Sequence, residues 1–363
     1  MPDIPYPAYT PPWLLKNGLT MTGYTALWSN RYWESTTENP EPPYQEIIFT
    51  GAGGVPIFGW VAIPENPRST IVGTYGITGS LDNQCFLRLL GRKAFAQGYA
   101  VVMFDWRAHG KTAKLSPTLT SDGLYEGEDF VRIAAQAKAI GCPASLWFTG
   151  YSLGGQLALW AEKAAQDLMR GVEDIGLSAA DIGGTAVICP SLDSIRSLSY
   201  LVKAPLGKYL EQAIARELKK LALAIYEAHP GAIDLAAIER ANSIWGFDRE
   251  LVIGRLGFPS VEAYYEASSG LHLLPHLNKP TLIIYATDDP MFDPAIVPDL
   301  QVACDRNPVI DLMLTRYGGH VGYLSSKAAQ YRAGDPDPWW AWNRVLEWCD
   351  SKSNGDNYSS HAA

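Results

Sequence analysis

Residues 145–166 read SLWFTGYSLGGQLALWAEKAAQ, and this stretch decides the fold. It begins with a short apolar run typical of a buried strand and ends with apolar residues at helical spacing. Between them, Gly150-Tyr151-Ser152-Leu153-Gly154 has the Gly-x-Ser-x-Gly pattern. Between a strand and a helix this pattern is typical of a nucleophile elbow, a sharp turn that exposes the serine hydroxyl. We therefore predict Ser152 as a nucleophile; a Gly- and Ser-rich helix start without chemical function is the alternative.

Short β-rich runs bounded by Gly, Pro and Asn recur on both sides of the elbow. The strand candidates are residues 44–50, 57–63, 69–75, 99–104, 145–150, 184–188, 280–286 and 309–315. Several are near-continuous apolar runs, such as AVVMF and TLIIY, which indicates a parallel sheet covered by helices on both faces. The first two candidates are close enough to form a hairpin. The sequence thus predicts an α/β fold with an eight-stranded, mostly parallel sheet and an antiparallel start.

The remaining segments predict the domain organisation. Residues 191–275 have helical patterns and no strand pattern, so we expect a helical cap over the carboxyl ends of the strands, where ligands bind in such folds. Extra helices on the flank of the sheet are the alternative. We expect an irregular N-terminal arm (1–43), a core (44–190 and 276–350) and a disordered polar tail (351–363).

A serine nucleophile needs a base within hydrogen-bond reach, and that base needs an orienting carboxylate. In this type of fold the chain order is Ser, then Asp or Glu, then His. His320 follows two glycines after the last predicted strand, and we predict it as the base. Two adjacent acids, Asp288 and Asp289, follow the preceding strand; we predict Asp289 as the orienting acid, with Asp288 as the alternative. Asp193 is a third candidate, better explained as a helix cap.

Attack on a carbonyl creates an oxyanion, which needs backbone donors already in position. One predicted donor is the N–H of Leu153, directly after the nucleophile, and the other is the N–H of Ile77 in the glycine-containing loop 75–80. A turn without ligand is the alternative for that loop. The residues expected to contact substrate are Tyr75, Gly76, Tyr151 and Trp245.

Composition limits the classes of partner. Of 363 residues, 47% are hydrophobic and 18% are charged, which predicts a globular chain. Lys and Arg number 29 against 38 Asp and Glu, a net charge of −9, so we expect no nucleic-acid partner. No run of about 18 apolar residues and no signal-peptide pattern occurs, which predicts no integral membrane segment and a cytoplasmic location. The predicted chemistry needs no cofactor and no metal.

Five segments together resemble the YheT-like branch of the α/β-hydrolase superfamily. They are GYSLGG (150–155), YGITGS (75–80), DWRAHG (105–110), TDDP (287–290) and YGGHVGY (317–323). The resemblance extends from about Pro11 to Trp348 and implies a Ser-Asp-His hydrolase fold with esterase-like activity, with eukaryotic relatives that act on phospholipids or make medium-chain fatty acid esters. Tyr75-Gly76 stands where the family pattern has His-Gly, and Arg-Ala-His-Gly (107–110) replaces Arg-Gly. The resemblance therefore does not predict which substrate this protein prefers.

These observations predict a serine hydrolase that cleaves carboxylic esters through an acyl-serine intermediate. The expected substrates are small-molecule esters with short- to medium-chain acyl groups or lipid-like esters. An acyltransferase that resolves the same acyl-serine with an alcohol is the first alternative. A non-catalytic binding module on the same fold is the second, and the complete Ser, Asp and His series argues against it.

Overall fold

The computed structural model describes residues 6–171 and 175–359, which build one eight-stranded sheet of order β1-β2-β4-β3-β5-β6-β7-β8. β1 and β2 run antiparallel to each other, β2 runs antiparallel to β4, and the other neighbours are parallel. The strands are β1 (Gln45–Thr50), β2 (Pro56–Ala62), β3 (Ser69–Thr74), β4 (Tyr99–Phe104), β5 (Leu146–Tyr151), β6 (Ile182–Ile188), β7 (Thr281–Ala286) and β8 (Ile310–Thr315). The predicted fold class and all eight strands are confirmed.

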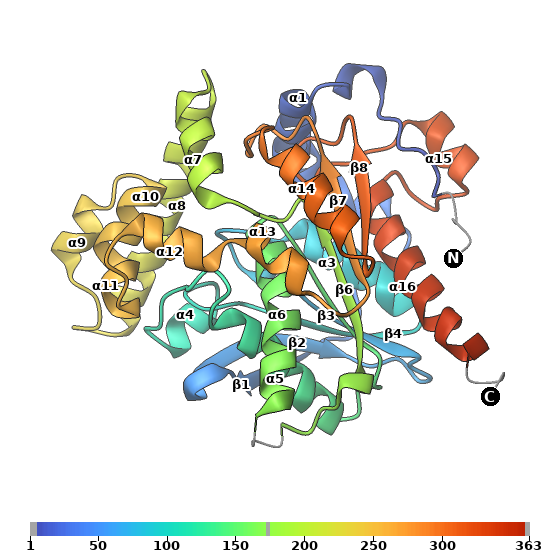
Figure 1. Cartoon of the computed structure of the whole chain (residues 1–363), viewed down its shortest axis with the longest axis horizontal. Helices are drawn as coiled ribbons and strands as arrows, with labels where there is room; N and C mark the ends of the chain where they lie inside the picture. The colour runs from blue at the N-terminus through green and yellow to red at the C-terminus, as the bar shows by residue number, and fades with distance from the viewer. Residues whose placement is uncertain (1–5, 172–174, 360–363) are drawn as a thin grey trace.

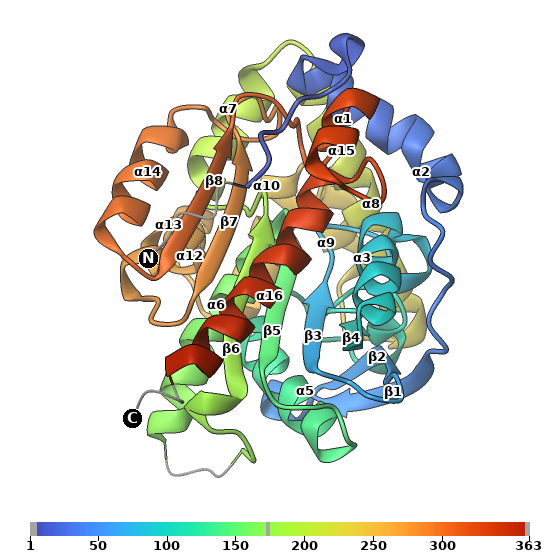
Figure 2. The same ribbon diagram turned by 90° about the vertical axis from the view of Figure 1, so that its right-hand side faces the viewer.

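Helices cover both faces of the sheet because its central strands are apolar on both sides. α3 (Cys85–Ala96) and α16 (Trp340–Ser359) lie on one face, while α5 (Glu126–Ala139) and α6 (Leu153–Arg170) lie on the other (Figures 1 and 2). The shorter core elements are η4 (Ala52–Gly54), η5 (Leu81–Asn83), α4 (Thr112–Leu115), η6 (Ala179–Asp181), α13 (Gly270–Leu273), η8 (Leu274–His276), α14 (Ile296–Arg306) and α15 (Lys327–Ala333).

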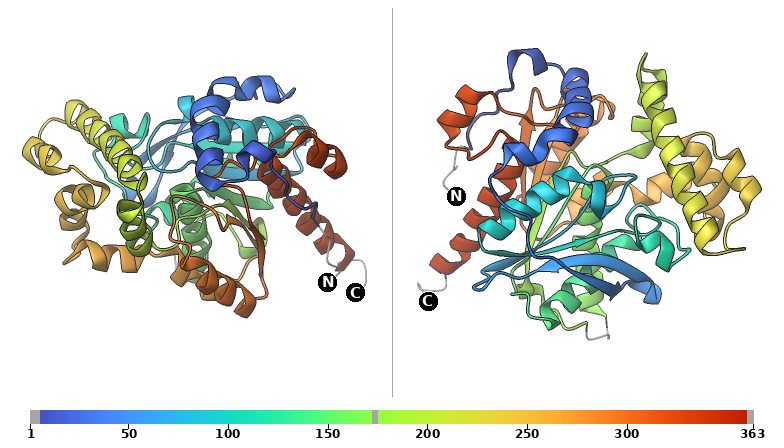
Figure 3. Two further views of the ribbon diagram at one scale, coloured as in Figure 1. Left: turned by 90° about the horizontal axis from the view of Figure 1, so that it is seen from above. Right: turned by 180° about the vertical axis from the view of Figure 1, so that it is seen from behind.

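The chain between β6 and β7 leaves the sheet as a helical insertion (residues 191–275), which projects to one side of the core (Figures 1 and 3). Its elements are α7 (Ser194–Lys203), α8 (Gly207–Ala228), α9 (Leu235–Arg240), α10 (Ile244–Phe247), η7 (Asp248–Val252), α11 (Ile253–Leu256) and α12 (Val261–Ser268). The insertion has its own hydrophobic cluster, which also includes Ala108, Ala113 and Leu119 of the core. This cluster fixes the insertion to the segment that follows β4.

The N-terminal segment differs from the irregular arm expected from the sequence, because most of residues 13–36 are helical. The elements are η1 (Trp13–Leu15), α1 (Gly18–Tyr24), η2 (Thr25–Ser29), α2 (Asn30–Tyr32) and η3 (Trp33–Thr36). Asn17 caps α1 by accepting from the N–H groups of Leu19 and Thr20. Met21 on this helix is fully buried in the main core, so tertiary packing holds a segment whose sequence has weak helical character.

The C-terminal helix also differs from the expected tail. α16 continues to Ser359, past residue 350, where the sequence suggests the end of the core. Lys352 forms an ion pair with Asp311 of β8 at 2.8 Å, and the Ser353 hydroxyl donates to the Cys349 carbonyl. These contacts stabilise the helix beyond residue 350, where the sequence becomes polar. The last part of the predicted tail, residues 360–363, lies outside the described residues.

Candidate active site

Ser152 lies in a strained turn between β5 and α6. Its φ of 55° and ψ of −129° are rarely adopted by a residue other than glycine, and such strain is typical of a nucleophile elbow. The two motif glycines make this turn possible. A Cβ on Gly150 would lie 2.2 Å from the Gly154 carbonyl oxygen, and one on Gly154 would lie 2.3 Å from the Tyr75 carbonyl oxygen. The Ser152 N–H donates to the Ile188 carbonyl at 3.1 Å, which ties the turn to β6.

A chain of hydrogen bonds joins Ser152, His320 and Asp289. The Ser152 Oγ lies 2.9 Å from His320 Nε2, and His320 Nδ1 lies 2.8 Å from Asp289 Oδ2. The His320 side chain is 16% exposed, whereas that of Asp289 is only 2% exposed. The structure therefore brings together the three residues that the sequence predicts as nucleophile, base and acid, in the geometry that a proton relay requires.

The two adjacent acids of the loop after β7 have different partners. Asp289 Oδ1 accepts from the Met291 N–H at 2.8 Å, which leaves its Oδ2 for His320. Asp288 does not contact the imidazole in this way; its Oδ1 accepts from the Gly319 N–H at 2.9 Å. Burial and the nearby charge of Asp289 raise the pKa of Asp288. The geometry thus favours Asp289 as the partner of the imidazole.

A largely apolar cavity opens beside Ser152 and His320 and extends under the helical insertion. Its lining includes both predicted oxyanion residues, Leu153 and Ile77. Leu153 is the first residue of α6, where the N–H has no intrahelical acceptor and the helix dipole favours negative charge. Gly76 packs directly against the nucleophile, since a Cβ there would lie 3.0 Å from that of Ser152.

Three residues expected to contact substrate lie elsewhere. The Tyr75 ring is fully buried and its hydroxyl donates to Asp105 Oδ1 at 2.6 Å. The Tyr151 hydroxyl donates to Gln84 Oε1 at 2.6 Å. Trp245 packs edge-on against Tyr265, with 5.4 Å between ring centroids. The described lining of the cavity contains none of these three, because each side chain is turned toward packing partners or buried acceptors.

Two residues that sequence analysis missed hold the loops around the site. The Thr22 hydroxyl of α1 accepts from the His320 N–H at 2.8 Å. His109 Nε2 accepts from the Thr78 N–H at 3.1 Å, directly after Ile77, and His109 Nδ1 donates to the Arg107 carbonyl. Burial lowers the pKa of His109 to about 3, so this imidazole is neutral. The sequence offers no signal for Thr22, whereas His109 lies in a segment already singled out by its resemblance.

Comparisons with known proteins agree with this site. The profile described as "Alpha/beta hydrolase family" matches residues 76–333. "Putative esterase slr0264" of Synechocystis sp. is 55% identical over 96% of this chain and 96% of its own length. "Putative esterase YheT" of Escherichia coli K12 is 26% identical over 79% of this chain and 80% of its own length. "Phospholipase ABHD3" of Mus musculus is also 26% identical, over 84% of this chain and 74% of its own length.

Among solved structures, the esterase Pf2001 of Pyrococcus furiosus has a TM-score of 0.50 and 16% identity, over 94% of this chain and 98% of that chain. This likeness concerns the fold alone. The family match and the 55% identical relative show that the chain belongs to the α/β-hydrolase family, and the similarity to YheT confirms the resemblance inferred from the motifs. Within residues 6–171 and 175–359, no helix is both long and apolar enough to cross a membrane.

Proposed function

We propose that this protein hydrolyses carboxylic esters of small molecules through an acyl-serine intermediate. The observation that carries the proposal is the hydrogen-bonded series Ser152–His320–Asp289, whose serine and histidine line an apolar cavity. The names of the relatives described above support an esterase, and the cavity supports an ester with an apolar portion. We also propose that the helical insertion (residues 191–275) acts as a cap over the core.

In the acylation step the Ser152 Oγ attacks the ester carbonyl carbon while its proton passes to His320 Nε2. The negative charge that develops on the carbonyl oxygen is stabilised by the N–H groups of Leu153 and Ile77. Collapse of the tetrahedral intermediate breaks the bond to the leaving oxygen, which takes the proton from His320. The alcohol departs and the acyl group stays on Ser152.

In the deacylation step water takes the place of the alcohol. His320 accepts a proton from this water as its oxygen attacks the acyl carbon. When the second tetrahedral intermediate collapses, the bond between the acyl carbon and the Ser152 Oγ breaks and His320 gives that proton to the Oγ. The carboxylic acid is released. Asp289 holds the imidazole with Nε2 facing the serine throughout both steps, because Nδ1–H donates to its carboxylate.

The decisive experiment combines active-site labelling with an ester panel. We expect a fluorophosphonate probe to label the wild-type protein and Ser194→Ala, whose serine lines the same cavity, but not Ser152→Ala. Turnover of p-nitrophenyl esters from acetate to decanoate should disappear in Ser152→Ala and persist in the control. Labelling or turnover that survives Ser152→Ala would reassign the nucleophile, and an unlabelled wild-type protein would favour the binding-module alternative.

The same assay separates hydrolysis from acyl transfer. With a primary alcohol added as acceptor, an esterase releases mainly the free acid, whereas an acyltransferase releases mainly the new ester. We expect the free acid to dominate at millimolar acceptor concentrations. A product consisting mostly of ester would replace hydrolysis with transfer and leave the roles of Ser152 and His320 unchanged.

A further inference from the structure

Two carboxyl groups belong to the wall of the apolar cavity. Asp122 lies on the loop between α4 and α5, and Asp248 is the first residue of η7 in the helical insertion. Both line the cavity that also contains Ser152 and His320, and they are only 7% and 5% exposed. Apolar side chains such as Phe247, next to Asp248 in the chain, surround them in this lining. Two buried acids in an apolar wall require an explanation.

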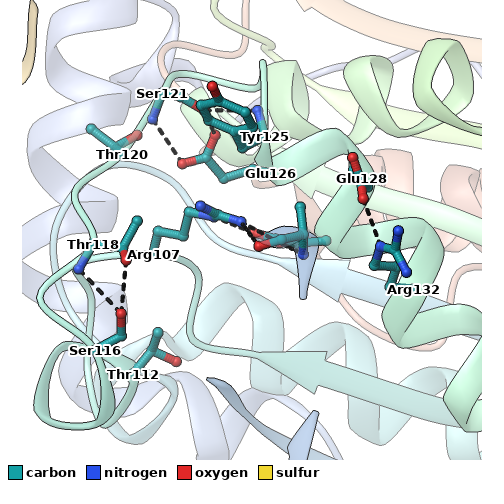
Figure 4. A network of polar contacts seen from close by, with 12 residues as sticks. Arg107, Thr112, Ser116, Thr118, Thr120, Ser121, Tyr125, Glu126, Glu128 and Arg132 are labelled. Atoms are coloured by element: carbon teal, nitrogen blue, oxygen red, sulfur yellow. Dashed lines mark hydrogen bonds and ion pairs between the residues drawn. The ribbon is translucent and has the colours of Figure 1, made fainter. Parts of the chain in front are cut away.

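The protein itself supplies hydrogen bonds to these carboxyls but no positive charge. Asp122 Oδ1 accepts from the Thr120 hydroxyl at 3.3 Å, and Asp248 accepts from the Tyr265 hydroxyl. Figure 4 shows Thr120 and Ser121, which precede Asp122 in the chain, together with Glu126. In the part of the chain that the structure describes, no Lys or Arg acts on either carboxyl.

A second observation also points to a ligand in this cavity. Ser197 and Trp106 line the same cavity and are 5% and 1% exposed. Within the described residues, the Ser197 Oγ and the Trp106 Nε1 have no hydrogen-bond partner. Buried polar groups are rarely left without a partner in native proteins. The cavity therefore offers polar groups as well as apolar surface to an occupant.

The charges around the pair are negative or neutral. Glu126 of α5 and Glu211 of α8 are acids, Tyr264 and Tyr265 of α12 contribute hydroxyl groups, and His109 is neutral. His320 is the other imidazole of the cavity and is already paired with Asp289.

Burial, reinforced by the charge of Glu126, raises the pKa of Asp122. Burial, reinforced by the charge of Asp122, raises the pKa of Asp248. Both carboxyls are therefore harder to ionise than exposed ones, and a bound cation would favour their deprotonated form.

We propose that Asp122 and Asp248 form a subsite for a cationic amine, so that the natural substrate is an ester with an ammonium group on the portion held under the helical insertion. This inference rests on the proposed esterase function. An ammonium group would donate hydrogen bonds to both carboxyls, and the aromatic rings of Phe247, Tyr265 and Trp106 in the same lining suit a cation. The apolar wall would hold the carbon chain between the ammonium and the ester.

The test compares two probes of equal length, n-hexylammonium and 1-hexanol, by calorimetry on the full chain. We expect wild type to bind hexylammonium at least tenfold more tightly than hexanol, and hexylammonium to slow fluorophosphonate labelling of Ser152. Asp122→Asn and Asp248→Asn should each abolish this preference. Asp122 has a φ of 49°, which asparagine tolerates. Glu262→Gln, an exposed acid on α12, is the matched control and should bind as wild type does.

Equal affinity for the two probes, or a preference that survives in both Asn variants, would overturn the proposal.

A second experiment uses the wild-type protein alone, so it still tests the proposal if the variants fail to fold. Because a bound amine favours the deprotonated form of the pair, whose pKa values are raised, its affinity should rise with pH between 6 and 8, by at most about tenfold per pH unit. Heats in two buffers of different ionisation enthalpy should reveal proton release, and its absence would contradict the subsite. Calorimetry needs no turnover, so failure of the proposed function, seen as an unlabelled Ser152, is recorded separately.

Discussion

Replacing Asp289 by asparagine should disable the proton relay while leaving the fold intact. The Met291 N–H donates to Asp289 Oδ1 at 2.8 Å and needs an acceptor, so the amide oxygen of the new side chain should take that position. The amide nitrogen then faces His320 Nδ1, which must become an acceptor. The imidazole is forced into the tautomer with its proton on Nε2, and this nitrogen can no longer receive the proton of Ser152.

The expected loss in kcat is about 10⁴-fold, equivalent to about 5.4 kcal/mol of transition-state stabilisation, by analogy with the orienting aspartate of serine proteases. Asp288→Asn is the matched control, because it makes the same chemical change one residue earlier. Its Oδ1 accepts from the Gly319 N–H, a role that an amide oxygen retains. We therefore expect Asp288→Asn to lose less than about tenfold.

The assay is kcat for p-nitrophenyl butyrate at pH 7.5, with thermal unfolding followed by circular dichroism for each variant. Asp289→Asn should unfold close to the wild-type temperature, so that the loss of turnover reports chemistry. The reasoning would be refuted by a folded Asp289→Asn protein that keeps more than a tenth of the wild-type kcat. A large loss in Asp288→Asn alone would move the acid to that residue.

Variants at Thr22, at His109 and at the pair Phe247 and Trp245 test the surroundings of the site. Thr22→Val removes the acceptor of the His320 N–H and should lower kcat about tenfold with little change in KM, and Thr22→Ser should restore it. Because burial lowers the pKa of His109 to about 3, the folded state resists its protonation. Urea unfolding should therefore show stability falling by up to about 1.4 kcal/mol per unit as pH drops from about 6.5 toward 3, and His109→Asn should flatten this trend. Phe247→Ala should shift the preferred ester chain length because Phe247 lines the cavity, whereas Trp245→Ala should cost about 2 kcal/mol of stability and leave the preference unchanged.

The strands and the order of the site residues could be predicted because they depend on local sequence. Apolar runs bounded by turn residues mark the strands, and the elbow motif marks the position of Ser152. The start of β6 at Ile182 was harder to predict than its end, since Gly183 and Gly184 weaken the strand pattern. Helix α1 could not be predicted, because its sequence GLTMTGY contains two glycines and it is held by packing against distant loops.

The sequence also could not predict the directions in which side chains point. The sequence places Trp245 in the helical insertion but does not say that its ring faces Tyr265 while Phe247 faces the cavity. The pairing of Asp122 with Asp248 is equally invisible, since 126 positions separate them. Such contacts depend on how the insertion packs on the core. Patterns within one segment therefore predict elements, whereas contacts between segments require the structure.

The two imidazoles of the cavity show why the structure favours only one of them as a base. His109 Nε2 already accepts from the Thr78 N–H, so a proton placed on it would face a donor and find no acceptor. Its Nδ1 faces a carbonyl oxygen, which carries no full charge to stabilise an imidazolium. His320 has the opposite arrangement, with Nε2 at the Ser152 hydroxyl and Nδ1 at the Asp289 carboxylate. Only this imidazole gains a negative partner when it takes up the proton, which is the condition that general base catalysis requires.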